Sequence, residues 1–197
     1  KNYTAKTRNL LSFNYKGFEI IGFPPPSSGG IILLQMMKMV SKYPIAKYGF
    51  QTAESVQLMV EAERRAYADR AEHLGDPDFW KVPLKTLQSD DYITNRMKDF
   101  IPGKASKSSD IKGGLIKESE QTTHLSVYDK DGNMVSVTTT LNGPYGSKTV
   151  VAGAGFLLNN EMDDFSIKPG VPNMFGAVGG IANAIAPGKR MLSSMCP

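Results

Sequence analysis

Residues 122 to 141 carry the pattern that decides how the middle of this chain folds, and they read TTHLSVYDKDGNMVSVTTTL. The two flanks, Thr122–Tyr128 and Met134–Leu141, have the alternating pattern that is typical of strands. Between the flanks, Asp131-Gly132 supplies the turn residues that favour an antiparallel hairpin. The sequence therefore predicts two paired strands joined by a turn at Asp129–Asn133.

The sequence before this hairpin predicts a second hairpin and three helices. Two short apolar stretches, Asn9–Phe13 and Phe18–Ile21, flank a Lys-Gly turn, which is typical of a hairpin. Three prolines at 24–26 then end regular pairing, because proline has no N–H to donate to a strand ladder. Apolar periodicity with start and stop signals predicts helices over about 29–43, 52–73 and 89–100.

The first of these helices is apolar almost all round, which predicts that it is buried. Ser27 or Ser28 precedes it, and serine is a residue type that caps helices. A Ser-Ser-Gly-Gly start can also cradle an anion, but the lysine and hydroxyl residue of a phosphate-binding loop do not follow it. We therefore favour capping and close packing at this helix start.

The helix over 52–73 has the strongest pattern. One of its faces gathers Val56, Met59, Val60, Glu63 and Tyr67. Glu61 with Arg65, and Arg65 with Asp69, are opposite charges at helical spacing and stabilise the helix. His73 lies in the last turn, where it interacts favourably with the helix dipole, and we favour this role over a catalytic one.

The second half of the chain is more polar and less regular. Residues from about 104 to 121 show little periodicity and predict a flexible linker, which divides the chain into regions 1–121 and 122–197. A strand or two is predicted at Val150–Leu158. Residues 169–188 are rich in glycine, proline and asparagine and predict an irregular, mobile segment.

Composition excludes several classes of function. The chain has 197 residues, of which 41% are hydrophobic and 21% charged, as in a globular domain. Its net charge is only +4 and its lysines and arginines are scattered, so we expect no nucleic-acid partner. One cysteine, Cys196, and two histidines exclude an intramolecular disulfide and a zinc cluster, and we expect no metal. The chain shows no signal-peptide pattern and no apolar run long enough for a membrane span.

Cleavage at the junction between Gln121 and Thr122 would produce an N-terminal threonine, a residue type that can act as a nucleophile. Cleavage before Thr122 would give one residue both a hydroxyl and a free α-amine that can act as its base. An α-amine has a pKa of about 7.7–8.0, so it can accept a proton near neutral pH. Before cleavage, the hydroxyl next to the Gln121 carbonyl would allow an N-to-O acyl shift followed by hydrolysis. On spacing alone, two threonines before a strand reflect β-propensity.

Several ordered motifs resemble those of the γ-glutamyltranspeptidases, which are N-terminal-nucleophile hydrolases. The small subunit of that family resembles TTHLSV at 122–127, DKDGN at 129–133, TLN at 140–142, LLNNEMDDFS at 157–166 and LSSM at 192–195. The end of its large subunit resembles PPPSSGG at 24–30 and the Asp69-Arg70 and LGDP motifs up to residue 77. The resemblance implies an α+β fold, part of a four-layer αββα sandwich with mainly antiparallel sheets, and no cofactor.

The resemblance also implies how the reaction proceeds. Thr122 would be the nucleophile, first for autocleavage of the Gln121-Thr122 bond and then for attack on a γ-glutamyl amide. Thr140 would hydrogen-bond and orient Thr122. A γ-glutamyl ester would form on Thr122, and water or an amino-acid or peptide amine would then accept the acyl group. Glutathione-like γ-glutamyl compounds are the substrates that this implies.

Further residues are implied for binding the glutamyl group. Two carboxylates and an amide suit a cation with three donors, and hydroxyls suit a carboxylate. The α-ammonium would be bound by Asn142, Glu161 and Asp164, and the α-carboxylate by Ser193 and Ser194. Residues 169 to about 180 would form a lid, with Phe175 as an aromatic gate.

Simpler interpretations exist for these residues. Asp163-Asp164 can be a turn pair or a calcium ligand, and Ser193-Ser194 can be capping residues. His124 with Ser193 and Asp164 would make a Ser-His-Asp set, but nothing in the sequence fixes that geometry. We therefore interpret His124 as structural.

The chain lacks two parts of the family's pattern. An arginine for the α-carboxylate comes from earlier in the large subunit, and a glycine pair for the oxyanion hole follows the Leu-Ser-Ser-Met motif. Gly179-Gly180 precedes the serines and is not that pair. The resemblance therefore predicts a central piece of a longer chain, whose remaining parts are its partners.

Three hypotheses follow for function. The first is an autoprocessed γ-glutamyl transferase and hydrolase. The second is an inactive or unprocessed piece with a structural role, and the third is a related acylase, such as a cephalosporin acylase or a poly-γ-glutamate enzyme. Because the family is mostly exported in bacteria, the resemblance implies a periplasmic or extracellular location.

Overall fold

The elements of the chain are given by a computed structural model that describes residues 3–112, 123–174, 176 and 178–196. Its first half contains β1 (Leu11–Tyr15), β2 (Phe18–Gly22), α1 (Gly29–Ser41), α2 (Ile45–Tyr48), α3 (Ala53–His73), α4 (Leu84–Gln88) and α5 (Asp90–Arg96). Its second half contains β3 (Thr123–Tyr128) and β4 (Met134–Thr139), and the 3-10 helices are η1 (Ser108–Asp110), η2 (Glu161–Asp164) and η3 (Ile181–Asn183). The named strands form two separate antiparallel hairpins, so the described fold is mixed helix and antiparallel sheet.

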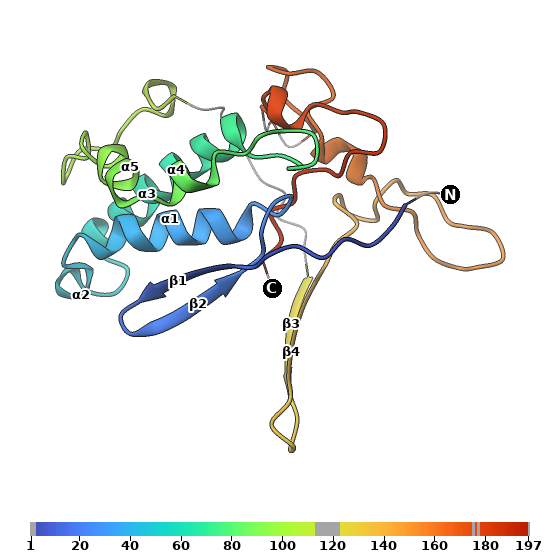
Figure 1. Ribbon diagram of the computed structural model, residues 1–197, viewed down its shortest axis with the longest axis horizontal. Helices are drawn as coiled ribbons and strands as arrows, with labels where there is room; N and C mark the ends of the chain where they lie inside the picture. Colours follow the sequence, from blue (N-terminus) through green and yellow to red (C-terminus); the bar gives the residue numbers. More distant parts are fainter. Residues whose placement is uncertain (1–2, 113–122, 175, 177, 197) are drawn as a thin grey trace.

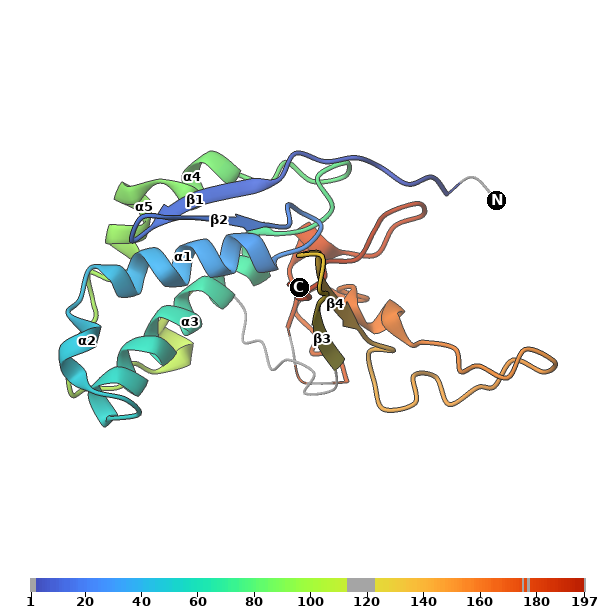
Figure 2. The same cartoon turned by 90° about the horizontal axis from the view of Figure 1, so that it is seen from below.

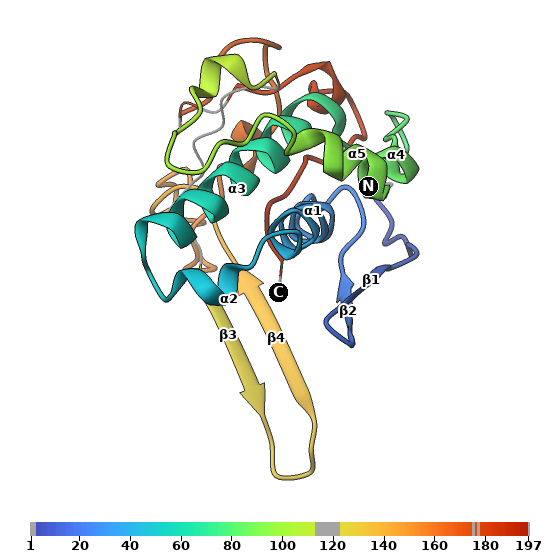
Figure 3. The same cartoon turned by 90° about the vertical axis from the view of Figure 1, so that its left-hand side faces the viewer.

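The helical core forms where α1 packs along α3 (Figures 1 and 3). Leu34 and Met39 of α1 and Leu58 of α3 are almost completely buried there. Ile93 of α5 closes the cluster, and Phe13 of β1 covers it from the hairpin side. The predicted burial of the first long helix is confirmed, because apolar partners surround it.

The N-terminus of α1 is closely packed, as the sequence predicts. A Cβ atom on Gly30 would lie 2.4 Å from the Phe23 carbonyl oxygen, so only glycine fits there. Ser28 occupies the N-cap position, but its side chain does not cap the helix; instead its hydroxyl donates to the Ser193 carbonyl at 2.9 Å. The expected serine contact comes from Ser27, whose Oγ accepts the Gly29 N–H at 3.2 Å.

The face of α3 that packs on α1 is a stripe of Leu58, Ala62 and Ala66, each 0% exposed. Val56 and Met59, which share the face singled out by the sequence pattern, are 44% and 50% exposed. Small alanines allow the backbones of α1 and α3 to approach closely, which a face of valine and methionine would prevent. The buried face is therefore not the one with the larger apolar residues.

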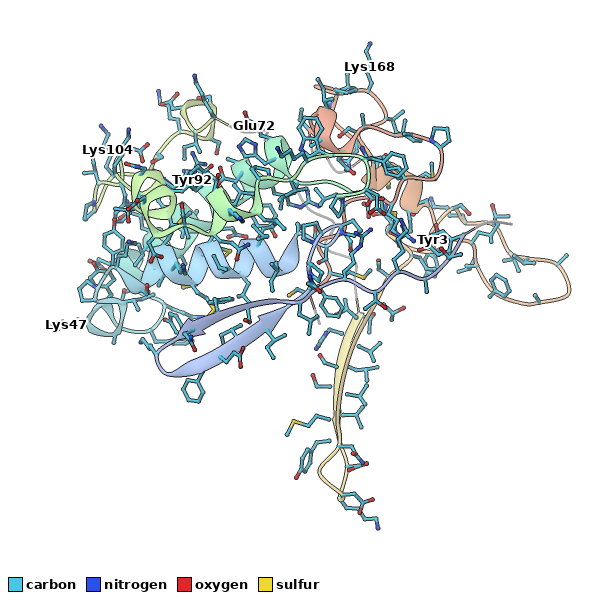
Figure 4. All side chains as sticks on the ribbon, in the orientation of Figure 1. Tyr3, Lys47, Glu72, Tyr92, Lys104 and Lys168 are labelled. Carbon is cyan, nitrogen blue, oxygen red and sulfur yellow. The ribbon has the colours of Figure 1, made fainter. Side chains whose placement is uncertain are left out.

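Ionic and polar contacts tie α3 to its neighbours. The predicted Glu61–Arg65 pair is present, with the Arg65 side chain 1% exposed. Arg65 also pairs with Asp99 at 2.8 Å, whereas Asp69 pairs with Arg96 at 3.2 Å, which replaces the expected Arg65–Asp69 pair. Asp69 accepts further hydrogen bonds from Gln35 and from Tyr92, which is labelled in Figure 4. These contacts fix the C-terminal turns of α3 against α1 and α5.

Two predicted elements differ from the observed ones, and two short helices were not predicted. The helix expected over 89–100 ends at Arg96, and Phe100 beyond it packs edge-on against Tyr43. The short helices α2 and α4, each preceded by a proline, were not predicted. The strands expected at Val150–Leu158 amount to one isolated bridge between Val150 and Leu157.

Both predicted hairpins are confirmed. β1 and β2 pair from Leu11 with Gly22 to Tyr15 with Phe18. β3 and β4 pair from Thr123 with Thr139 to Tyr128 with Met134. The β3–β4 hairpin projects away from the helices, and most of its side chains are exposed, while His124 and Thr138 at its base line a cavity (Figures 1 and 4).

Residues 178–196, the last part of the irregular segment that begins after β4, lie against the C-terminal end of α3 and the N-terminal end of α1, whereas the loop around residue 150 extends away from them (Figure 2). The Gly180 N–H donates to the Ala71 carbonyl at 3.2 Å, and a Cβ on Gly75 would lie 2.2 Å from the Ala182 carbonyl oxygen. Ser193 joins the Pro-rich loop, donating its N–H to the Pro26 carbonyl and accepting from the Ser28 N–H. The sequence-distant ends of two helices thereby support one irregular segment.

None of the helices in the described ranges is both long enough and apolar enough for a bilayer crossing.

Candidate active site

One cavity of about 660 Å³ lies between the irregular segment and the end of α3. Six of the residues predicted for the site line it: Thr140, Asn142, Glu161, Asp164, Ser193 and Ser194. Arg70 of α3 and His124 of β3 also line it. The remaining predicted residues, Gln121, Thr122 and Phe175, lie outside the described residues.

Thr140 and Asn142 form one corner of the cavity, just after β4. The Asn142 N–H donates to Thr140 Oγ1 at 2.9 Å, so the threonine hydroxyl can donate its own hydrogen to another group. Asn142 has a φ of 71°, a left-handed conformation that asparagine tolerates. Its Nδ2 donates to the Asn160 carbonyl at 3.2 Å, and its amide oxygen is the acceptor that the side chain presents.

Glu161 and Asp164 form an acidic wall on η2. Burial, repulsion from Asp164 and a hydrogen bond with Asp164 together raise the pKa of Glu161 to about 7. Near neutral pH the pair therefore carries between one and two negative charges and can take up a cation. Asp163, between them, uses its carboxylate to accept the Met174 N–H at 3.2 Å.

Asp163 and Asp164, interpreted as a turn pair or a calcium ligand, lie in the short 3-10 helix η2. Within the described ranges, no group of three or more histidine, cysteine, aspartate or glutamate side chains could hold a metal ion. The calcium interpretation therefore has no arrangement of side chains to support it among these residues.

Ser193 and Ser194 form the opposite, hydroxyl-bearing wall. Ser193 Oγ accepts the Met195 N–H at 3.2 Å, and Ser194 Oγ accepts from Arg70 Nη2 at 2.8 Å. A hydroxyl that accepts from the protein still has its own hydrogen to donate. These serines lie in extended chain rather than at the start of a helix, so the capping interpretation is wrong.

His124 makes its described hydrogen bonds within the hairpin. Its Nδ1 lies 2.8 Å from Thr138 Oγ1, and its Nε2 lies 3.2 Å from Ser126 Oγ and 3.3 Å from Ser136 Oγ. These contacts hold the ring across the two strands. The structural interpretation of His124 therefore fits the geometry better than a set with Ser193 and Asp164.

Two residues that line or support the site were not predicted as site residues: Asn183, and Arg70, which the sequence gives only as part of a family motif. Asn183 is 5% exposed and connects both walls, donating from Nδ2 to the Asp164 carbonyl at 2.7 Å and accepting the Leu192 N–H at Oδ1 at 3.0 Å. Arg70 reaches Ser194 from a position 124 residues away in the sequence. Only the folded chain brings these partners together, so spacing along the sequence could not identify them.

Comparisons with known proteins identify the family of the chain. The family model described as gamma-glutamyltranspeptidase matches residues 1–197. The chain is 51% identical over 197 residues to the glutathione hydrolase proenzyme of Escherichia coli (strain K12), which covers 99% of the chain and 34% of that relative. It is 39% identical over 198 residues to the acylase ACY 1 proenzyme of Pseudomonas sp. (strain SE83), covering 100% of the chain and 33% of that relative. The chain thus spans about a third of the length of these curated relatives.

A solved structure shows the same fold. It is the cephalosporin acylase from Bacillus halodurans, with a TM-score of 0.72 and 25% identity. The match covers 99% of the present chain and 32% of the acylase chain. Because the family model matches the whole chain, the chain belongs to the gamma-glutamyltranspeptidase family.

Proposed function

We propose that the protein carrying this chain is a γ-glutamyltransferase and hydrolase that acts on glutathione-like γ-glutamyl compounds. The observation that carries the proposal is the cavity around which Thr140, an acidic wall and a hydroxyl-bearing wall converge. The name of the relative at 51% identity, a glutathione hydrolase proenzyme, supports the same activity and a zymogen that is processed.

The two walls suit the two charged groups of a glutamyl donor. Asn142, Glu161 and Asp164 would accept hydrogen bonds from the α-ammonium, and their negative charge would attract it. Ser193 and Ser194 would donate to the α-carboxylate. Because the ends of the glutamyl group would be held at both walls, its γ-carbonyl would be fixed in position for attack.

Thr122 would perform the reaction after cleavage of the Gln121-Thr122 bond. Its α-amine takes the hydroxyl proton while Oγ bonds to the γ-carbonyl carbon, and the amide C–N bond breaks as the leaving amine receives that proton. Water or an acceptor amine then attacks the γ-glutamyl ester and returns the proton to Oγ. Thr140 would orient the Thr122 hydroxyl, and Phe175 would act as an aromatic gate.

A second candidate function is hydrolysis of a related acyl amide, which the 39% identity to an acylase proenzyme favours. A glutaryl or adipyl donor has no α-ammonium. A wall with Glu161 and Asp164 would then bury negative charge without a cation, which is unfavourable. The acidic wall therefore favours the γ-glutamyl donor.

The surrounding organisation is part of the same proposal. Residues 1–121 would belong to the large-subunit region, with a linker at about 104–121, and residues 122–197 to the small-subunit region. Together they would form part of a four-layer αββα sandwich completed by the rest of the full-length chain. Export to the periplasm or the cell exterior would match the family's usual location.

Replacing Thr122 tests the proposal in the full-length protein. We expect Thr122→Ala to abolish both the split before residue 122, seen by mass spectrometry, and release of anilide from a γ-glutamyl anilide. Thr123→Ala is the matched control, because Thr123 is an exposed residue of β3, and it should still split. An intact wild-type chain after long incubation, or faster turnover of glutaryl than of γ-glutamyl amides, would refute the proposal.

A further inference from the structure

Arg70 has a place in the cavity that the proposed reaction does not yet use. It lies in the last turns of α3, half-buried, with its guanidinium at the cavity wall. Its Nη2 donates to Ser194 Oγ at 2.8 Å, and its Nε donates to Ser28 Oγ at 2.9 Å. One planar group therefore contacts the serine wall and the Pro-rich loop at the same time.

The direction of these hydrogen bonds determines what Ser194 can do. A guanidinium has donors only, so Ser194 Oγ must act as the acceptor toward Arg70. The Ser194 hydroxyl hydrogen is then directed to another acceptor, and a carboxylate oxygen in the cavity is a suitable one. Arg70 thus orients Ser194 as a donor, and its positive charge makes that donor stronger.

Ser28 extends the same contact to Ser193. It is 0% exposed, accepts from Arg70 Nε and donates its hydroxyl hydrogen to the Ser193 carbonyl at 2.9 Å. The Ser28 N–H donates to the same carbonyl at 2.7 Å. Ser28, a buried residue that Arg70 contacts, therefore holds the main chain between Ser193 and Ser194.

The end of α3 that carries Arg70 is also held in position. Its neighbour Asp69 is 4% exposed and accepts hydrogen bonds from Gln35 and Tyr92. This network anchors the end of α3 in the core while Arg70 points to the cavity. Asp69 thus anchors the helix on its core side, and Arg70 contacts the serine wall on its cavity side.

We propose that Arg70 is a positioning residue for recognition of the donor's α-carboxylate, acting by orienting the hydroxyl of Ser194 and by bracing Ser193 through Ser28. The inference rests on the proposed function and adds a determinant of specificity to it. It predicts that Arg70 contributes to selecting donors with a free α-carboxylate over donors whose α-carboxyl is an amide.

The test compares two donors in the full-length protein, a γ-glutamyl anilide and the same anilide with its α-carboxylate converted to a carboxamide. For Arg70→Met we expect kcat/KM for the free acid to fall about tenfold, as for loss of a charge-assisted hydrogen bond, with little change for the amide. Ser194→Ala should reduce the preference for the acid similarly. The double variant should lose little more than either single one, because the two side chains act together.

Further variants separate positioning from folding. Ser28→Ala and Arg70→Lys should each reduce the preference for the acid in the same direction but less, since one contact or the charge is kept. Arg64→Met, a change of the same kind on α3 outside the cavity, should leave the preference unchanged. The inference is overturned if Arg70→Met and Arg70→Lys keep the wild-type preference, or lower activity equally on both donors. A wild-type protein that turns over neither donor would instead refute the proposed function.

Discussion

Glu161 shows how one side chain can make binding depend on pH. Its pKa is raised to about 7 by burial and by Asp164, so the acidic wall gains a second negative charge as the pH rises through neutrality. An α-ammonium donor should bind more tightly with that charge present. A proton on Glu161 would weaken binding on the acid side.

We therefore expect kcat/KM for a γ-glutamyl anilide to rise as pH increases through about 7, and Glu161→Gln to lose this component of the profile. The α-amine of the nucleophile titrates slightly higher, at about 7.7–8.0, and should remain visible in the variant. The measurement is the pH profile of both proteins. Glu72→Gln, on the exposed side of α3, is the control and should keep the wild-type profile. Identical profiles for wild type and Glu161→Gln would contradict this role.

At the scale of the element, the faces of α3 show that an apolar side chain is not necessarily a buried one. Leu58 is 0% exposed on the stripe facing α1, whereas Val56, two residues earlier, is 44% exposed. Truncation of a buried leucine loses burial and leaves a cavity, while truncation of an exposed valine loses little.

In urea denaturation we expect Leu58→Ala to lower the free energy of unfolding by about 2–5 kcal/mol. Val56→Ala should change it by less than about 0.5 kcal/mol. Leucine and valine differ in helix propensity by less than about 0.7 kcal/mol, so a larger difference between the two variants reports packing. Equal losses would mean that the α1–α3 contact is not where the core lies.

The regular elements were largely predictable, because their signals are local. The turn residues at Asp131-Gly132 and the caps around α3 act within a few positions of the structures that they specify. The short helices α2 and α4 have too few residues for a periodic pattern, and the bridge at Val150 is a single pair. The burial of α3 depends on α1 as its partner, which no pattern within α3 reveals.

The candidate site was predictable only as a set of residues. Motifs identified Asn142, Glu161, Asp164 and the two serines, but not how they are held. The contacts that hold them come from Arg70, which lies 124 residues from Ser194, and from Asn183, which lies 19 residues from Asp164. Side chain to main chain hydrogen bonds in an irregular segment have no period and therefore leave no pattern.

At the scale of the whole molecule, the two hairpins differ in how far they pack against the rest of the chain. Leu11 and Phe13 of β1 are buried against the helical part, while Leu125 and Val127 of β3 are 46% and 51% exposed. A two-stranded hairpin without a packed face is marginally stable.

For the 197-residue chain, we expect the amide hydrogens of β3–β4 to exchange with solvent much faster than those of α1 and α3, by hydrogen-exchange mass spectrometry. The β1–β2 hairpin serves as the internal control, because it has the same number of strands but a buried face. Slow exchange in β3–β4, matching that of α1, would show that this hairpin has packing partners in solution.

Asn183 has a consequence for how the molecule can vary. A single buried amide joins the loop that bears Asp164 to the loop that bears Ser193. If a glutamyl donor binds as proposed, this amide contributes to the spacing between the groups that would hold its α-ammonium and those that would hold its α-carboxylate. Insertions or deletions in either loop would then change that spacing.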